Sequence, residues 1–322
     1  MTGKWSQEKI VFFIFVLTFV GLSIGLNGFL SVANALTLVR SVAVLGMLGV
    51  GMALVVIGRG IDLSVIANMV MSVGFTLYLA NQGHAMPVAL LFGLLISLAF
   101  GLINGLLIAY AEIPALFATL AFGTCVYGFG RVFLIPTDVV YLPQNTGWFE
   151  FLGKGTLFEV PMPIVAFLLL SLLAFLLLRF TKFGRFVYGI GENYQCARIT
   201  GIPVRVMVVV QYVITSAVTF VSGVVFATSV SSVNTRLFNS TMIYDVILVV
   251  VLGGIGLSGG KGGVRNVIVG SLLIGTMLNG MTIMDMPVTV QNLIKGMMLL
   301  IAITIDTMLN PRDEQVSQQG DI

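Results

Sequence analysis

Apolar runs of about 20 residues follow one another along most of this chain, and they limit what it can fold into. A helix needs about 20 mainly apolar residues to cross a bilayer, whereas a membrane β-barrel needs segments of about ten residues that alternate in polarity. The run at 164–178 is long, apolar and without alternation. With 58% hydrophobic and 9% charged residues, the chain also lacks the polar surface of a soluble domain. The sequence therefore predicts an all-α, polytopic integral membrane protein.

The runs predict about ten transmembrane or re-entrant helices in a single transmembrane domain, residues 1–309, followed by a polar tail, residues 310–322. The expected helices are 10–30, 36–57, 63–81, 87–110, 114–134, 162–180, 206–229, 241–257, 264–283 and 288–308. The short run 241–257 either spans the bilayer or re-enters, and its Gly-rich end favours a broken helix. If the N-terminus is cytoplasmic, 11 of the 16 Lys and Arg residues fall on the cytoplasmic side. The positive-inside rule thus predicts cytoplasmic N and C termini, with the tail in the cytoplasm.

The densest group of charged residues is the stretch 182–205, between two apolar runs. Most of the remaining surface faces lipid, so this cytoplasmic stretch is where the chain can meet a water-soluble protein. Glu192 or Asn193 can open a short helix there, and Gly201 can close it. Arg198 then lies on the helix between them.

Two segments resemble nucleotide-binding motifs, but neither has the neighbouring residues that such a motif needs. The segment 254–259, GIGLSG, fits a dinucleotide pattern, but apolar membrane runs flank it in place of a βαβ unit. The following Lys261 precedes Gly262, whereas a phosphate-binding loop needs Ser or Thr there. One His and two Cys give no metal site or disulfide framework, and a net charge of +3 gives no basis for nucleic-acid binding. We expect no cofactor and no metal.

The polar residues inside the apolar runs can have either of two roles. Each one can form an interhelical hydrogen bond worth about 0.6 kcal/mol, or together they can line a pathway for a hydroxyl-rich solute. Asp62 can also cap the helix that follows it. Asp245 and Lys295 lie near the ends of their runs, where we expect them to reach the interface. The pathway candidates are Asp62, Ser64, Asn68, Asn104, Gln211, Thr215, Thr219 and Asn279.

Five segments, in order along the chain, resemble the membrane permease subunits of bacterial ABC importers for simple sugars, the ribose, xylose, arabinose and galactose class. They are GRGIDLSV (58–65), IPALFATLAFGTCVYGFGR (113–131), TKFGRFVYGIGENYQCARITGI (181–202), VVLGGIGLSGGKGG (250–263) and LIKGMMLLIA (293–302). The resemblance covers most of the chain, from about residue 36 to residue 306. Arg59 and Ile66 stand where the family has Gly, as does Asn266, and these departures bear on whether the permease pairs with an identical copy.

The resemblance implies a non-enzymatic transport subunit in the bacterial cytoplasmic (inner) membrane. Its expected partners are ABC ATPase subunits, a periplasmic or extracellular solute-binding protein, a second permease copy or paralogue, and membrane lipid, with no nucleic acid. The 182–205 loop would couple the chain to the ATPase through Gly191, Glu192, Asn193, Ala197, Arg198, Thr200, Gly201 and Ile202. One alternative is a permease of the same architecture for a nucleoside or a furanose signal molecule. A second alternative is an ion-coupled secondary carrier, which the sequence favours less because no apolar run contains a pair of acidic residues.

Overall fold

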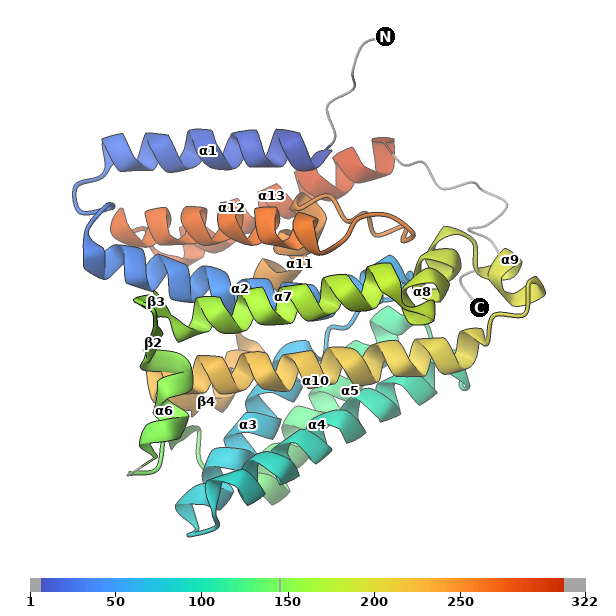
Figure 1. The fold of residues 1–322 in the computed structure, drawn as a ribbon, viewed down its shortest axis with the longest axis horizontal. Coiled ribbons are helices and arrows are strands. Elements are labelled where there is room, and N and C mark those ends of the chain that lie inside the picture. The colour runs from blue at the N-terminus through green and yellow to red at the C-terminus, as the bar shows by residue number, and fades with distance from the viewer. Residues whose placement is uncertain (1–6, 145, 310–322) are drawn as a thin grey trace.

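Helices dominate the structure, a computed structural model that describes residues 7–144 and 146–309 (Figure 1). The long helices are α1 (Gln7–Gly25), α2 (Val32–Ile57), α3 (Val65–Asn81), α4 (Met86–Ala109), α5 (Ala115–Phe129), α7 (Met162–Phe180), α10 (Val204–Val230), α12 (Val264–Ile283) and α13 (Val288–Leu309). The shorter ones are α6 (Gly147–Lys154), α8 (Lys182–Glu192), α9 (Tyr194–Ile199), α11 (Met242–Leu252), the π-helix Gly130–Leu134 that continues α5, and the 3-10 helix Thr235–Asn239. Two antiparallel strand pairs, β1 (Val139–Tyr141) with β4 (Ser232–Asn234) and β2 (Thr156–Leu157) with β3 (Val160–Pro161), complete the described fold.

Among the described helices, eight are long and apolar enough to cross a membrane, and α3 and α11 are shorter apolar helices. These ten correspond to the ten expected from the sequence, so the polytopic all-α prediction is confirmed. At about 1.5 Å per residue, the 17 residues of α3 reach about 25 Å and the 11 residues of α11 about 16 Å. Since a bilayer core is about 30 Å thick, α11 is too short to cross it alone.

Helix α2 lies at the centre of the bundle. The most apolar part of α2 is 89% buried, whereas that of α1, which has a similar mean hydropathy, is 6% buried. Small residues allow this central position, because they leave room for neighbouring helices. Val249 of α11 and Val267 of α12 lie against Gly49, and the ring of Phe167 of α7 lies against Gly46. Glycines on α2 thus let the neighbouring helices pack closely against it in the core.

Two groups of four helices, α2–α5 and α10–α13, share the same order: a candidate membrane span, an apolar helix too short to be one (α3 or α11), and two further candidate spans. The fourth span of the first group is α5 together with the π-helix that continues it, Ala115–Leu134. In the first group α3 packs against α10, and in the second α11 packs against α2. Likewise α4 packs against α10 and α12 against α2. Helices α2 and α10 run in opposite directions along the bundle (Figure 1). This is the arrangement of an inverted-topology repeat, whose interface passes beside both short helices.

The two ends of the bundle differ. Helices α8 and α9 extend beyond one end, where α1 starts and α13 finishes, while α6 and the strand pairs cover the other end (Figure 1). The prediction of a loop over 182–205 is therefore only partly right, because most of that stretch is helical. Buried Val187, Ile190 and Gly191 form the inner side of α8, whereas Lys182 and Arg185 are exposed. The predicted tail, residues 310–322, lies outside the described residues.

Candidate functional site

Helix α9 is a short, capped helix at the exposed end of the bundle. The Asn193 side chain accepts a hydrogen bond from the Cys196 backbone N–H at 2.9 Å, which opens the helix. At its other end the Thr200 hydroxyl donates to the Cys196 carbonyl at 2.9 Å, and Gly201 takes a left-handed φ of +83°. The predicted opening at Asn193 and closing at Gly201 are thus both present.

One residue of α9, Ala197, is buried, whereas Arg198 and Ile199 project into solvent. The Ile199 side chain is 84% exposed. Ile202 follows the turn, and its backbone N–H donates to the Ala197 carbonyl at 3.1 Å. An exposed isoleucine beside an exposed arginine on a protruding helix has the composition of a protein-binding surface.

Helix α8 connects α9 to the core through backbone contacts. The Gly260 N–H donates to the Ile57 carbonyl at 2.8 Å, which joins the loop 253–263 to the end of α2. Gly191 fits between these two backbones, since an added Cβ would overlap the Ile57 oxygen and Gly260. The Tyr188 hydroxyl donates to the Gly262 carbonyl at 2.7 Å. The end of α8 is therefore fixed to α2 and to the segment that leads into α12.

Arg59, which departs from the family pattern, belongs to the same junction. Its Nε donates to the Gly191 carbonyl at 2.8 Å, and its Nη2 donates to the Glu192 carbonyl at 2.9 Å. These are the last carbonyls of α8, where the helix dipole favours a cation. Arg59 holds a left-handed φ of 69°, which is costly for a residue with a Cβ. The guanidinium contacts compensate for that backbone conformation.

A polar cluster lies at the start of α3. Asp62 Oδ1 accepts hydrogen bonds from the Ser64 backbone N–H at 2.9 Å and from the Ser64 hydroxyl at 2.5 Å. The Ser64 hydroxyl accepts from Asn104 Nδ2 of α4 at 2.7 Å. Thr119 of α5 accepts from the Leu63 N–H at 3.0 Å. The turn 62–64 is therefore tied to α4 and α5.

The Asp62 carboxyl is buried, and burial raises its pKa to about 6, although the hydrogen bonds from Ser64 act in the opposite direction. Asp62 is a turn-forming acceptor for Ser64 here, and the expected side-chain cap on α3 is not formed.

The other pathway candidates are buried, except for the partly buried Asn279, but they differ in their contacts. Thr215 donates to the Gly51 carbonyl of α2 at 2.9 Å, and Asn279 exchanges two hydrogen bonds with Asn34. These contacts hold helices together. Asn68, Asn104 and Gln211 behave differently, because a buried polar atom in each has no hydrogen-bond partner in the described part of the chain. The remaining candidate, Thr219, is also buried.

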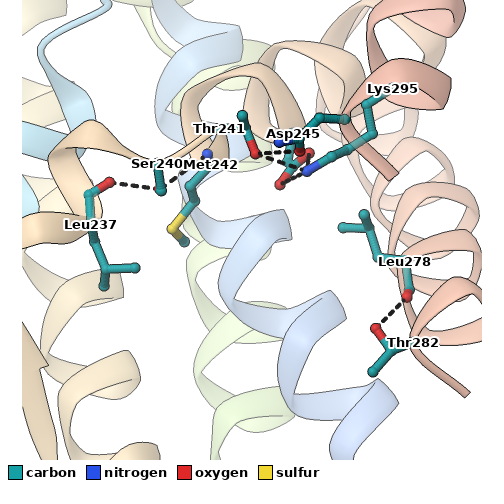
Figure 2. Close-up of polar contacts among 9 residues, drawn as sticks. Leu237, Ser240, Thr241, Met242, Asp245, Leu278, Thr282 and Lys295 are labelled. Atoms are coloured by element: carbon teal, nitrogen blue, oxygen red, sulfur yellow. Dashed lines mark hydrogen bonds and ion pairs between the residues drawn. The ribbon is translucent and has the colours of Figure 1, made fainter. Parts of the chain in front are cut away.

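A second polar cluster surrounds the start of α11 (Figure 2). Lys295 Nζ of α13 lies 2.9 Å from Asp245 Oδ1 and donates to Asp245 Oδ2 at 3.2 Å. It also donates to the Thr241 hydroxyl at 3.0 Å, which itself donates to Asn292 Oδ1 at 3.0 Å. Asp245 and Lys295 are each 8% exposed. The expectation that they reach the interface separately is therefore wrong, because they form a buried ion pair between α11 and α13.

The sequence contained signals for part of this geometry. Asp245 and Lys295 stand out in the sequence as charged residues within apolar runs. Their pairing could not be predicted, because they lie 50 residues apart along the chain. Within residues 7–144 and 146–309, no three His, Cys, Asp or Glu side chains gather as a metal site would need.

Comparisons with known proteins agree on one class. The family model described as "Branched-chain amino acid transport system / permease component" matches residues 34–303. The ribose import permease protein RbsC of Bacillus subtilis is 33% identical over 293 residues, which cover 91% of this chain and 90% of the relative. The L-arabinose ABC transporter permease protein AraH of Azospirillum brasilense is 30% identical, covering 94% and 89%. The galactofuranose transporter permease protein YtfT of Escherichia coli K12 is 28% identical, covering 85% and 80%. No solved structure matches the chain.

Replacing Arg59 tests the junction between α2 and α8. We expect Arg59→Ala to lower stability by about 1 kcal/mol through loss of its hydrogen bonds, and Arg59→Gly to lower it less, because glycine relieves the left-handed backbone. Thermal unfolding of both variants in detergent gives the comparison. An alanine variant as stable as the wild type, or more stable than the glycine variant, would contradict this role.

Breaking the Asp245–Lys295 pair tests the second cluster. Removing one partner leaves a buried charge, so Lys295→Met is expected to cost about 3–5 kcal/mol, measured as a lower Tm in detergent. The exchange Asp245→Lys with Lys295→Asp should recover part of that loss. Glu150→Gln is the control, because its ion pair with Lys154 is exposed and worth at most about 1 kcal/mol. Equal effects of Lys295→Met and Glu150→Gln would show that the pair is not buried.

Proposed function

This chain belongs to the family of branched-chain amino acid transport system permease components, and we propose that it forms the translocation pathway of an ATP-driven importer for a monosaccharide or a similar small polar solute. The resemblance to sugar ABC importer permeases seen in the sequence is confirmed by the relatives. The chain is a multi-pass protein of the bacterial inner membrane.

The named solutes of the relatives support the solute class. Ribose and L-arabinose are sugars, and the E. coli galactofuranose permease favours a furanose ring as a second candidate. A pathway for such solutes needs polar groups that hydrogen-bond hydroxyls within an apolar bundle. The chain itself makes and breaks no covalent bond in this proposal; ATP hydrolysis takes place in separate ABC ATPase subunits.

The observation that carries the coupling proposal is helix α9, which is capped, exposed and connected to the core through the backbone of α8. We propose that the ATPase binds α9 in the cytoplasm, with Arg198 and Ile199 at the contact. Asn193, Thr200 and Gly201 hold the helix ends, while Ala197 and Ile202 pack it onto the chain. Gly191 and Glu192 then pass its displacement to α2 and the 253–263 loop, as a rigid-body movement.

The importer needs further partners in this proposal. A solute-binding protein would bind at the opposite end, where α6 and the strand pairs lie, and a second permease copy or a paralogue would complete the pathway. This orientation puts both termini, and the tail 310–322, in the cytoplasm, in keeping with the positive-inside rule.

The pathway is proposed to run beside α3 and α11. Short helices in corresponding positions of inverted repeats are the usual place for solute sites. Next to α3, the unpartnered polar atoms of Asn68, Asn104 and Gln211 are suited to a hydroxyl-bearing solute, because a bound solute would satisfy them. Asp62, Ser64, Thr215, Thr219 and Asn279 would position the helices around the pathway.

A mild-detergent purification of the tagged chain from its native host tests the assembly. We expect an ABC ATPase and a solute-binding protein to co-purify with it, as identified by mass spectrometry. The double variant Arg198→Glu/Ile199→Ser should no longer co-purify with the ATPase, and its rate of solute uptake should fall at least tenfold. Lys182→Glu, a charge reversal at the same end but outside α9, is the control. Recovery of the chain alone, with ATP-independent uptake in vesicles, would favour a secondary carrier.

The variant Asn68→Leu separates a solute contact from a structural role. The Asn68 side chain makes no hydrogen bond with the described residues, so an apolar residue of similar volume should leave Tm unchanged or raise it. We expect the KM for solute uptake to rise about tenfold, in keeping with a lost hydrogen bond to solute. Asn279→Leu is the contrast: it should lower Tm by depriving Asn34 of its partner and leave KM unchanged. An unchanged KM in Asn68→Leu would exclude Asn68 from the pathway.

A further inference from the structure

A groove of about 950 Å³ opens between α1, α7, α8 and α12, at the end of the bundle that carries α9. The groove is open to its surroundings along one side. Neither the α9 surface nor the polar clusters of α3 and α11 line it. Three arginines line its rim, and three apolar residues line its wall: Arg179, Arg185, Arg265, Phe175, Leu178 and Val264.

The three guanidinium groups come from three different helices, α7, α8 and α12. All three arginines are exposed, and none of their side chains forms a hydrogen bond or ion pair within residues 7–144 and 146–309. Two carboxylates, Glu8 and Glu192, also line the groove, but no ion pair joins them to the arginines. The groove therefore has an excess of positive charge that the described protein does not neutralise.

The first turn of α12 adds to this potential. Gly263 precedes α12 without a side-chain cap, and Val264 and Arg265 begin the helix beside the groove. The start of a 20-residue helix carries a partial positive charge and free N–H donors. The helix dipole thus acts in the same direction as the arginines.

The groove lies where two candidate membrane spans, α7 and α12, have their ends. Arg179 lies in the last turn of α7, and Arg265 lies in the first turn of α12. Leu178 lies beside Arg179 in the last turn of α7, and Phe175 lies one turn further from the end of the helix. The outer face of α7 is apolar and exposed, as at Leu172, where it meets lipid chains. A charged rim above an apolar wall fits a molecule with an ionic head and a hydrocarbon tail.

We propose that this groove binds an anionic phospholipid, with the phosphodiester at Arg179, Arg185 and Arg265 and an acyl chain along α7. Basic pockets between membrane helices recognise anionic headgroups in this way. The proposal holds for any transported solute and does not depend on the ATPase contact at α9. A lipid in this position would brace α7 and α8 against α12.

Lipid retention by the purified full-length protein tests the proposal. The delipidated protein is titrated with phosphatidylglycerol or phosphatidylcholine, and bound lipid is counted by native mass spectrometry. We expect the wild type to keep one phosphatidylglycerol in preference to phosphatidylcholine. The triple variant Arg179→Gln/Arg185→Gln/Arg265→Gln should weaken binding about a hundredfold, at about fivefold per arginine. Lys182→Gln, which removes a charge from α8 outside the groove, should bind as the wild type does.

Three results would overturn the proposal. Retention by the triple variant equal to that of the wild type would exclude the arginines. Equal retention of phosphatidylcholine would exclude recognition of net negative charge. Displacement of phosphatidylglycerol by inorganic phosphate would identify a site for a free anion instead of a lipid. Thermal unfolding of each variant confirms that the exposed substitutions leave the fold intact.

Discussion

A helix that starts inside a membrane protein leaves backbone N–H groups that water cannot reach, and the protein must supply acceptors for them. Each of the short helices α3 and α11 is preceded by a turn in which a side chain accepts a backbone N–H. At α11 this is the first N–H of the helix, whereas at α3 it is the N–H of Ser64, the residue before the helix. Asp62 accepts from the Ser64 N–H, and the Ser240 hydroxyl accepts from the Met242 N–H at 3.2 Å (Figure 2). Each short helix thus begins at a turn that its own side chains hold in place.

Each start is also fastened to a more distant helix of its own group of four. In the first group Thr119 of α5 reaches the turn before α3, and in the second Lys295 of α13 reaches α11. In each group the fourth helix, α5 or α13, therefore holds the short second helix, α3 or α11. The contact is a hydrogen bond to a hydroxyl in the first group and an ion pair in the second. The inverted arrangement of α2–α5 and α10–α13 thus extends from helix lengths to polar contacts, and it leaves the interface between the groups beside both short helices.

Helix positions followed from the sequence because each apolar run must satisfy its own backbone, so all ten expected helices are present. The capped helix α9 was also predictable, since Asn193 and Gly201 act locally. Helix α8 was missed because glycines and charges obscure its buried face, formed by Val187 and Ile190. Pairing of Asp245 with Lys295 and of Arg59 with α8 was not predictable, because each depends on residues brought together only by the fold. Nor does apolar sequence distinguish the central α2 from the peripheral α1, since lipid and protein interior accept the same side chains.

The contact at Gly191 has a mechanical consequence. Where side chains separate two elements, a small shift of one is absorbed by changes of rotamer, and the other need not move. At Gly191 the backbone of α8 touches the Ile57 carbonyl and Gly260 directly, with no side chain between them. The joint is therefore stiff, and it acts on the end of α2, the most buried of the eight candidate membrane spans. Displacement of α8 by a few tenths of an ångström has to be followed by the centre of the bundle.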